Sequence, residues 1–392
     1  MESRVPRCRF CAAALDHVFV DLGMSPLCES FVPAEKLSAM EPFYPLVVYV
    51  CDECFLVQLE EFVPPEEIFT EYAYFSSYAD SWVEHARRYA NAICDRERLG
   101  RGSFVVEVAS NDGYLLQHFV ARGVPTMVEF FGRATAARVA RERGRANLLL
   151  GNNVLAQVPD LNDFVAGMKI LLAPAGVVTM EFPHLLRLMQ ENQFDTIYHE
   201  HFSYFSYTTT ARIFEAHGLR LFDVEEIPTH GGSLRIYACH SDDVRPETER
   251  SRELAAREKI FGLQDPRCYD DFGEQVRETK RKLLEFLIGA RRKGARIAGY
   301  GAPGKGNTLL NYCGIRTDFI EYTVDRNPYK HGRYLPGTHI PIFAPDKIFE
   351  TRPDYVLILP WNFKDEIVSQ MARIREWGGK FVVPIPEVTV IP

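Results

Sequence analysis

The chain has 392 residues, of which 46% are hydrophobic and 12% aromatic, and its formal net charge is -8. This length exceeds one typical core, so two or three domains are expected. The acidic balance disfavours nucleic acid as the main partner, and no apolar run of membrane-spanning length or signal-peptide pattern is found, so we expect a cytoplasmic protein without a membrane partner.

Residues 1–70 carry two C-x-x-C pairs, and we predict a zinc-binding domain that includes a strand at 43–50. In a cytoplasmic chain such pairs favour metal over disulfides. Four thiolates complete the tetrahedral coordination of a zinc ion and leave no open position. This metal is therefore expected to be structural and not catalytic. Buried free thiols are the alternative, and Cys28 between the pairs is left as an unused thiol. The candidate ligands are Cys8, Cys11, Cys51 and Cys54.

Residues 71–100 combine clustered tyrosines and serines with a predicted helix at 83–99. Hydroxyl groups of this kind suit a polar ligand such as a sugar, and Tyr72 and Tyr78 are the candidates. The alternative is a capped helix start whose tyrosines pack on the next domain.

Residues 101–240 alternate predicted strands and helices, which is typical of an α/β domain. The strand at 104–106 leads into a turn of small residues, and a helix is predicted from Tyr114. A glycine at the turn tip lets a ligand approach the backbone, and the helix N-terminus offers free N–H groups. The turn is acidic and lacks the glycines of a dinucleotide site, which favours S-adenosylmethionine, with its positive sulfonium, over a pyrophosphate. A turn without a ligand is the alternative. The candidate cofactor residues are Glu107, Ser110, Asn111, Asp112 and Gly113.

Further elements of this domain follow from the apolar runs and the helical periodicity. Strands are predicted at 126–128, 147–150 and 176–180, helices at 163–172 and 208–217, a turn at 173–176, and a final strand pair at 218–225 and 232–239. The mixed charges of residues 241–294 predict exposed linker helices without chemistry.

Residues 295–392 are predicted to form a second α/β unit, which begins at a glycine-rich turn. Gly299, Gly301 and Gly304 satisfy G-x-G-x-x-G, and Asp325 ends the next predicted strand, at 320–324. The turn also half-matches a P-loop, but Gly306 stands where Ser or Thr would bind Mg²⁺. The loop is suited to binding a phosphate group, but the two partial matches do not identify a cofactor.

The order of these motifs resembles one family. A Cys₄ knuckle is followed by E-V-A-S-N-D-G-Y-L-L, E-F-P-H-L-L, Y-H-E-H-F-S-Y, H-G-G-S-L-R and G-Y-G-A-P-G-K-G-N-T-L-L-N. The chain resembles S-adenosylmethionine-dependent C-methyltransferases that act on nucleotide-linked 4-keto deoxysugars and supply branched sugars to natural products such as antibiotics. The resemblance implies a zinc-binding domain (1–70), a class I methyltransferase domain with a Rossmann-like sheet (71–240), a helical linker (241–294) and a C-terminal Rossmann-like domain (295–392) that helps to hold the nucleotide sugar.

The chemistry of such a reaction suits particular side chains. A ketone at C4 acidifies the proton on C3, and His230 is the candidate base, because imidazole titrates near neutral pH and the resemblance places the catalytic histidine in H-G-G-S. Tyr198, His199 and His201 are expected to line the sugar pocket and stabilise the enolate oxygen, with both histidines on one face if the segment is extended. Hydrogen-bonded structural histidines are the alternative. The candidate substrate-binding residues are Tyr72, Tyr78, His184, Gly301, Lys305 and Asn307.

The central domain departs from the family pattern. Relatives have a G-I-E-P-A-x-N segment at the end of the second strand, whose acid holds the cofactor ribose, and this chain lacks about one strand–helix unit there, on the order of 20 residues. Either the unit 126–143 slides into the second-strand position, where Glu129 takes the ribose role, or the sheet has a gap. Asn152 and Asn153 remain cofactor candidates, and Gln157 stands where relatives often have histidine.

We therefore predict a C-methyltransferase that acts at C3 of a nucleotide-linked 4-keto-2,6-dideoxyhexose, with dTDP as the expected nucleotide. Two other functions stay open. One is an NAD-dependent sugar-nucleotide oxidoreductase, which the glycine-rich turn suggests. The other is a non-catalytic nucleotide-sugar binding protein, which the missing segment suggests. The oligomeric state, monomer included, is not determined by the sequence.

Overall fold

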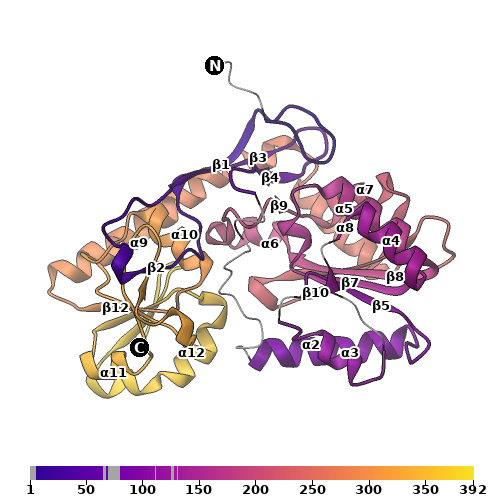
Figure 1. Ribbon diagram of the computed structural model, residues 1–392. Helices are drawn as coiled ribbons and strands as arrows, with labels where there is room; N and C mark the ends of the chain where they lie inside the picture. The colour runs from indigo at the N-terminus through magenta and orange to yellow at the C-terminus, as the bar shows by residue number, and fades with distance from the viewer. Residues whose placement is uncertain (1–5, 65–67, 69–79, 111, 125–127, 130) are drawn as a thin grey trace.

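The computed structural model describes residues 6–64, 68, 80–110, 112–124, 128–129 and 131–392. Two α/β lobes lie side by side, and the N-terminal module sits above the junction between them (Figure 1). Within the described residues, no helix is long and apolar enough to cross a membrane.

The N-terminal module contains a small antiparallel sheet that the central lobe completes, and a second, two-stranded sheet that it shares with the C-terminal lobe. The strand order of the first sheet is β1-β3-β4-β9. The strands are β1 (His17–Ser25), β3 (Tyr44–Val50), β4 (Val57–Leu59) and β9 (Ser203–Tyr204). The last strand comes from the central lobe, and β2 (Val32–Pro33), just before η1 (Ala34–Lys36), pairs with β14 (Arg333–Tyr334) of the C-terminal lobe. The module therefore ties the two lobes together.

The central lobe is a six-stranded sheet of order β10-β11-β8-β7-β5-β6. The strands are β5 (Val105–Val108), β6 (Val128–Glu129), β7 (Ala146–Asn152), β8 (Leu172–Pro183), β10 (Leu219–Ile227) and β11 (Ser233–His240). Neighbours from β6 to β8 pair in parallel, and β10 and β11 are antiparallel. The predicted α/β class and the final strand pair are thus confirmed.

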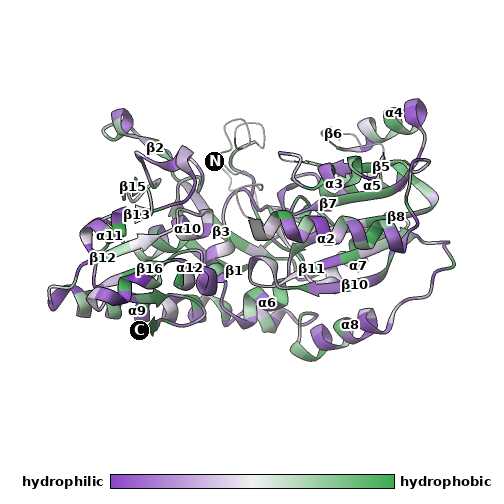
Figure 2. Ribbon diagram, turned by 90° about the horizontal axis from the view of Figure 1, so that it is seen from below, coloured by the Kyte–Doolittle hydropathy of each residue, from purple (hydrophilic) through white to green (hydrophobic). Residues whose placement is uncertain are grey.

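Helices cover both faces of this sheet. Helices α2 and α3 lie on one face, and α4, α5 and α7 lie on the other (Figure 1). Their bounds are α2 (Asp80–Arg96), α3 (Leu116–Val120), α4 (Arg133–Arg143), α5 (Leu161–Leu171) and α7 (Tyr207–Ala216). Figure 2 shows hydrophobic residues along the inner strands and hydrophilic residues on the arginine-rich α4. Short elements complete the lobe: η3 (Leu155–Gln157), α6 (Leu185–Gln190), η4 (Phe194–Thr196) and η5 (Thr229–Gly231).

The second-strand position beside β5 is filled by β6, with Glu107 opposite Val128 and Val108 opposite Glu129. The structure therefore has the first of the two expected arrangements, in which the unit 126–143 takes the second-strand position. The alternative, a gap within the sheet, is not found between β5 and β6. The shortening falls at the sheet edge, where one strand fewer leaves the inner pairs intact.

Two sequence expectations for local structure are wrong. The predicted turn at 173–176 is part of β8, because Leu172 already pairs with Ala146; residues 173–176 form an irregularity in β8 before the pairing resumes at Leu148 and Val177. The helix predicted from Tyr114 begins only at Leu116, after a series of turns.

The C-terminal lobe has a six-stranded sheet of order β15-β13-β12-β16-β17-β18. The strands are β12 (Ile297–Tyr300), β13 (Thr323–Val324), β15 (Ile342–Phe343), β16 (Tyr355–Ile358), β17 (Lys380–Val383) and β18 (Thr389–Ile391). The helical elements are α9 (Phe272–Arg292), α10 (Gly304–Cys313), η7 (Pro328–Lys330), α11 (Lys347–Thr351), η8 (Trp361–Phe363), α12 (Lys364–Gln370) and η9 (Ala372–Trp377).

The charged segment 241–294 is more than an exposed linker. It contains α8 (Glu249–Phe261), η6 (Pro266–Tyr269) and α9. Helix α9 buries an apolar stripe that includes Val276 and Leu283, and α8 buries Glu258. Charge counts alone hide such stripes, because one buried side chain per turn suffices to anchor a helix.

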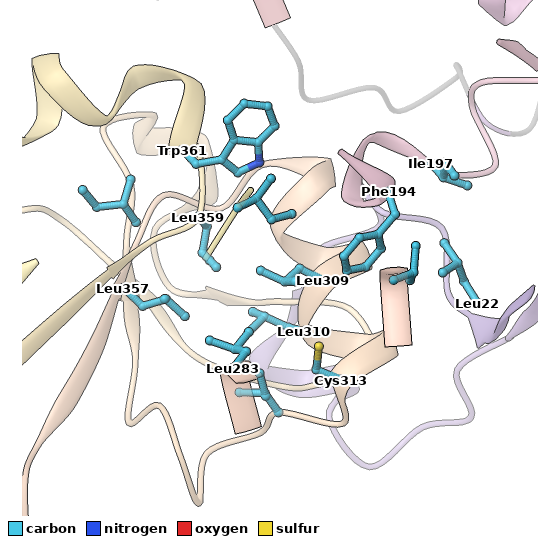
Figure 3. Packing of buried hydrophobic residues seen from close by; sticks show 14 of the residues in the cluster. Leu22, Phe194, Ile197, Leu283, Leu309, Leu310, Cys313, Leu357, Leu359 and Trp361 are labelled. Atoms are coloured by element: carbon cyan, nitrogen blue, oxygen red, sulfur yellow. The ribbon is translucent and has the colours of Figure 1, made fainter. Parts of the chain in front are cut away.

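One hydrophobic core runs through all three parts of the chain. In Figure 3, Leu22 of the N-terminal module, Phe194 and Ile197 of the central lobe, and Leu309 and Trp361 of the C-terminal lobe belong to one cluster. The lobes therefore hold a fixed arrangement at their junction, where the site lies.

Candidate active site and zinc centre

The four cysteines predicted to bind zinc lie together. Their Sγ atoms are all within 4.8 Å of one another, and the Cys8–Cys54 and Cys11–Cys51 sulfurs are each 3.5 Å apart. Sulfurs at the zinc–thiolate distance in a tetrahedron are about 3.8 Å apart, so the cluster has the size of a Cys₄ zinc site. Such a site has no open coordination position, which gives zinc a structural role.

The backbone forms the two halves of this centre in the same way. Ala12 and Phe55 each follow the second cysteine of a pair, with φ angles of 63° and 62°. Their N–H groups donate to the carbonyl oxygens of Cys8 and Cys51 at 2.9 and 2.7 Å. Gln58 Nε2 donates to Cys8 Sγ at 3.1 Å, a contact of the kind that orients a metal-binding thiolate.

Buried polar groups lie at the carboxyl ends of β5 and β7, where α/β sheets bind ligands. Burial raises the pKa of Glu107 to about 8, although a hydrogen bond from Ser110 opposes the shift. Within the described residues, Glu107 Oε2 and Asn152 Nδ2 are buried without a hydrogen-bond partner. Buried polar atoms are normally satisfied, so a ligand with hydroxyl and amino groups, such as S-adenosylmethionine, fits here.

The other predicted cofactor residues surround the same turn. Gly113 has a φ of 79°, and Asp112 Oδ1 accepts the N–H of Tyr114 at 3.3 Å. Asn111 and the side chain of Glu129 lie outside the described residues, as do Tyr72 and Tyr78. The roles of these residues stay predictions.

His230 sits at the tip of the β10–β11 hairpin in a strained conformation. Its φ and ψ are 55° and 20°, a left-handed region that non-glycine residues seldom occupy. Asn153, itself at a φ of 58°, places Nδ2 3.2 Å from His230 Nε2. The Trp82 ring meets the imidazole edge-on, with centroids 5.0 Å apart. Strained residues persist only where the surroundings fix them, and they concentrate at functional sites.

Lys305 lies close enough to His230 to lower the pKa of its imidazole, and both Lys305 and His230 lower the pKa of His201. Burial lowers the pKa of His230 to about 4, and the positive charge of Lys305 contributes. Burial, followed by the charge of His230, lowers the pKa of His201 to about 3. Both imidazoles are therefore neutral at physiological pH and able to accept a proton.

Lys305 brings the C-terminal lobe into this site. Burial lowers the pKa of its ammonium to about 8, although nearby Asp195 opposes the shift. Lys305 Nζ donates to Asn362 Oδ1 at 2.9 Å and lies 4.4 Å from the centre of the Trp361 ring. Trp361 Nε1 in turn donates to Asp195 Oδ2 at 2.7 Å. The junction thus combines a cation with two neutral histidines.

The H-E-H cluster does not form an extended segment, so its residues separate. A turn closed by the bond from His201 N to Tyr198 O, 2.9 Å long, points them in three directions. His199 Nε2 contacts Pro45 O at 3.1 Å, and Glu200 accepts a bond from Cys28 Sγ at 3.2 Å. Of the three, only His201 has a described interaction with His230, and the Tyr198 ring packs against His201 at a tilt of 38°, with ring centroids 4.3 Å apart. The shared face expected for His199 and His201 is wrong, because the backbone turns between them.

The glycine-rich turn of the C-terminal lobe is closed by the N-terminal module. The Glu29 carboxylate packs against Gly304, where an added Cβ would lie 3.6 Å from its Oε1, and pairs with Lys330 Nζ at 3.3 Å. A Cβ on Gly304 would lie 2.6 Å from Cys28 Sγ. The anion position at the start of α10 is therefore filled by a carboxylate of the chain itself.

Three predicted substrate residues have structural contacts. His184 Nε2 pairs with the buried Glu258 at 2.7 Å, and Asn307 Nδ2 donates to Cys28 O at 2.5 Å. Gly301, with a φ of 91°, packs its backbone against Pro360. Their contact with substrate stays a prediction.

Sequence reasoning missed several residues around His230. Trp82, His85, Glu181, Asp195 and Trp361 all belong to this neighbourhood. Glu181 opens the E-F-P-H motif, where only the histidine drew attention, and the others lie in segments without a recognisable pattern.

Three family models match consecutive parts of the chain. A zinc-binding domain matches residues 8–69, a methyltransferase domain 82–224, and a C-methyltransferase C-terminal domain 228–386. Together with the Cys₄ centre and the ligand-binding edge of the central sheet, they define a zinc-containing methyltransferase.

C-methyltransferase NovU of Streptomyces niveus is 35% identical over 410 aligned positions, which cover 99% of this chain and 97% of that protein. The chain therefore belongs to the C-methyltransferase family, and S-adenosylmethionine and zinc are its cofactors. The alignment is longer than this chain, so NovU contains residues that this chain lacks.

Solved structures are more distant. A 1,6-didemethyltoxoflavin N1-methyltransferase of Burkholderia thailandensis is 18% identical, with a TM-score of 0.33, and covers 48% of this chain and 95% of its own. Magnesium protoporphyrin IX methyltransferase of Synechocystis PCC 6803 is 12% identical, with a TM-score of 0.29, and covers 41% and 82%.

Proposed function

We propose that the protein transfers a methyl group to C3 of a nucleotide-linked 4-keto-2,6-dideoxy sugar through an enolate. The supporting observation is the convergence of His230, His201 and Lys305 at the junction of two lobes, close to the ligand-binding edge of the central sheet. A dTDP-linked sugar is the expected substrate, and the name of NovU, a C-methyltransferase, agrees with transfer to carbon.

His230 acts as the base in this proposal. Its neutral imidazole accepts the C3 proton, and the electron pair of the C–H bond becomes the enolate. His201 and Tyr198 face the negative charge that develops on the C4 oxygen. The positive charge of the Lys305 ammonium stabilises this negative charge in a water-poor site. S-adenosylmethionine, when bound, would supply an electrophilic methyl group for C3 and would leave as S-adenosylhomocysteine. Glu107 and Asn152 would hold its polar groups.

The test uses purified holoprotein with zinc bound. A dTDP-linked 4-keto-2,6-dideoxyhexose in D₂O, without S-adenosylmethionine, should exchange its C3 hydrogen faster than in buffer, and addition of the cofactor should give a C3-methylated sugar. His230→Gln should abolish both. Cofactor binding without C3 exchange would refute the proposal.

Two observations disfavour an NAD-dependent oxidoreductase. Glu29 occupies the helix start that a pyrophosphate would need, and Asp325 Oδ2 accepts the N–H of Ala302 at 2.7 Å, within the glycine-rich turn itself. The non-catalytic binder remains an outcome of the exchange test, in which the sugar binds but neither exchange nor methylation follows.

A further inference from the structure

A buried charged group lies beneath the His230 loop. Glu181, on β8, is fully buried, and its Oε2 accepts from Arg235 Nη2 at 2.8 Å and lies 3.1 Å from His85 Nε2. Its Oε1 accepts from Thr229 Oγ1 at 3.1 Å. Among the described residues, these side-chain partners come from β11, α2 and the His230 loop itself.

Three routes lead from Glu181 to His230. Thr229 directly precedes the histidine in the chain. The backbone carbonyl of Glu181 accepts the N–H of Asn153 at 2.7 Å, and the Asn153 side chain contacts the imidazole. His85 stacks on Trp82 with ring centroids 5.0 Å apart, and Trp82 meets the imidazole edge-on.

The energetics of this group favour a positioning role over a purely stabilising one. Removing two charges from water costs more than their pairing often returns, so a buried ion pair such as Glu181–Arg235 is weak evidence for stability. A left-handed histidine, by contrast, needs surroundings that fix its backbone. We propose that Glu181, which makes no hydrogen bond to the imidazole itself, is a positioning residue that holds His230 in its strained conformation through Thr229, Asn153 and the His85–Trp82 stack.

This inference rests on the proposed function, and Thr229 offers a selective test. Thr229→Val keeps the shape of the side chain but removes the donor to Glu181, while the ion pair stays intact. Thr229→Ser keeps the donor. Thr248→Val is the matched control, because Thr248 Oγ1 donates to the Asp223 carboxylate at 2.7 Å elsewhere in the lobe.

We expect Thr229→Val to lower kcat and the cofactor-free C3 exchange rate together, by about 10- to 100-fold, since displacement of a catalytic group by about 1 Å costs up to about 10². KM for the sugar and for S-adenosylmethionine should stay within about twofold of the parent. Thr229→Ser should recover most of the rate, and Thr248→Val should keep it.

Three results would overturn the inference in distinguishable ways. Parent-like kcat and exchange in Thr229→Val would remove the positioning role while leaving the proposed function intact. An equal loss in Thr229→Ser, with a lowered Tm in both variants, would indicate a merely structural threonine. No C3 exchange in the parent protein would refute the proposed function, and the inference with it.

Discussion

The contact between Gly231 and the C-terminal lobe allows a sharp prediction. Gly231 has a φ of 91°, and a Cβ there would lie 2.5 Å from Trp361 Cη2 and 2.9 Å from Gln193 Nε2. Neither group can move freely, because Trp361 is bonded to Asp195 and Gln193 Nε2 donates to the Gly231 carbonyl at 2.7 Å. Gly231→Ala should therefore push the His230 loop away from the C-terminal lobe.

The expected loss of folding stability in Gly231→Ala has two parts. The left-handed conformation costs an alanine roughly 1 kcal/mol, and overpacking against a fixed neighbour adds about 1–3 kcal/mol. We expect Gly231→Ala to destabilise the protein by about 2–4 kcal/mol. If the loop moves to relieve the clash, kcat should fall by about 10- to 100-fold.

Gly218→Ala is the control for the cost of placing an alanine in the left-handed backbone conformation. Gly218, in the same lobe, has a φ of 70°, and an added Cβ would meet only the Lys169 side chain, at an ordinary van der Waals distance of 3.5 Å. This variant should lose about 1 kcal/mol of stability and keep its activity. Calorimetric unfolding and steady-state kinetics of both variants provide the comparison. Equal stability and equal kcat in the two variants would refute the packing of Gly231 on Trp361.

Three further predictions concern the metal, the charge of the site and a buried carboxylate. Cys54→Ser should lose zinc and lower Tm, while Cys268→Ser, outside the cluster, should keep zinc; metal analysis that finds parent-like zinc in Cys54→Ser would contradict the Cys₄ site. Activity should fall as pH rises through about 8, because the Lys305 ammonium then loses its proton, and fall on the acid side towards about 4, where His230 becomes protonated. In Lys305→Arg the alkaline decline should move to higher pH, and an unchanged profile would show that another group causes it. Glu258→Ala should cost about 3 kcal/mol, since it removes the acceptor of two N–H groups at the start of α7 and leaves His184 unpaired. Glu253→Ala, on the exposed side of α8, is its control in thermal unfolding, and equal losses would contradict a special role for Glu258.

Much of the site could be predicted from local patterns. The spacing of the cysteine pairs indicated the zinc centre, and the apolar runs indicated the strands that carry Glu107 and Asn152 to one sheet edge. The histidine of the H-G-G-S motif could be singled out because imidazole titrates near neutral pH and the family resemblance points to that motif, and the structure places it at the tip of a hairpin. These signals depend on neighbours within a few residues.

Other features depend on contacts between distant segments. The H-E-H cluster looked like one unit in the sequence. In the structure, His199 contacts Pro45, Glu200 accepts a hydrogen bond from Cys28, and only His201 interacts with His230. The glycine-rich turn looked open to a phosphate, but Glu29, more than 270 residues away in the chain, closes it. No local pattern marks a carboxylate that will fill an anion site of another domain.

The sequence by itself determined the zinc ligands, the order of the α/β elements and the family, because these are written in residue type and short spacing. Only the tertiary structure decided which side chains meet: it brought Lys305 and Trp361 to His230, placed Glu181 beneath the loop and moved β6 beside β5. The physical reason is that burial creates these effects. A histidine, a lysine or a glutamate acquires its shifted pKa or its positioning role only when remote elements exclude water around it and supply its partners.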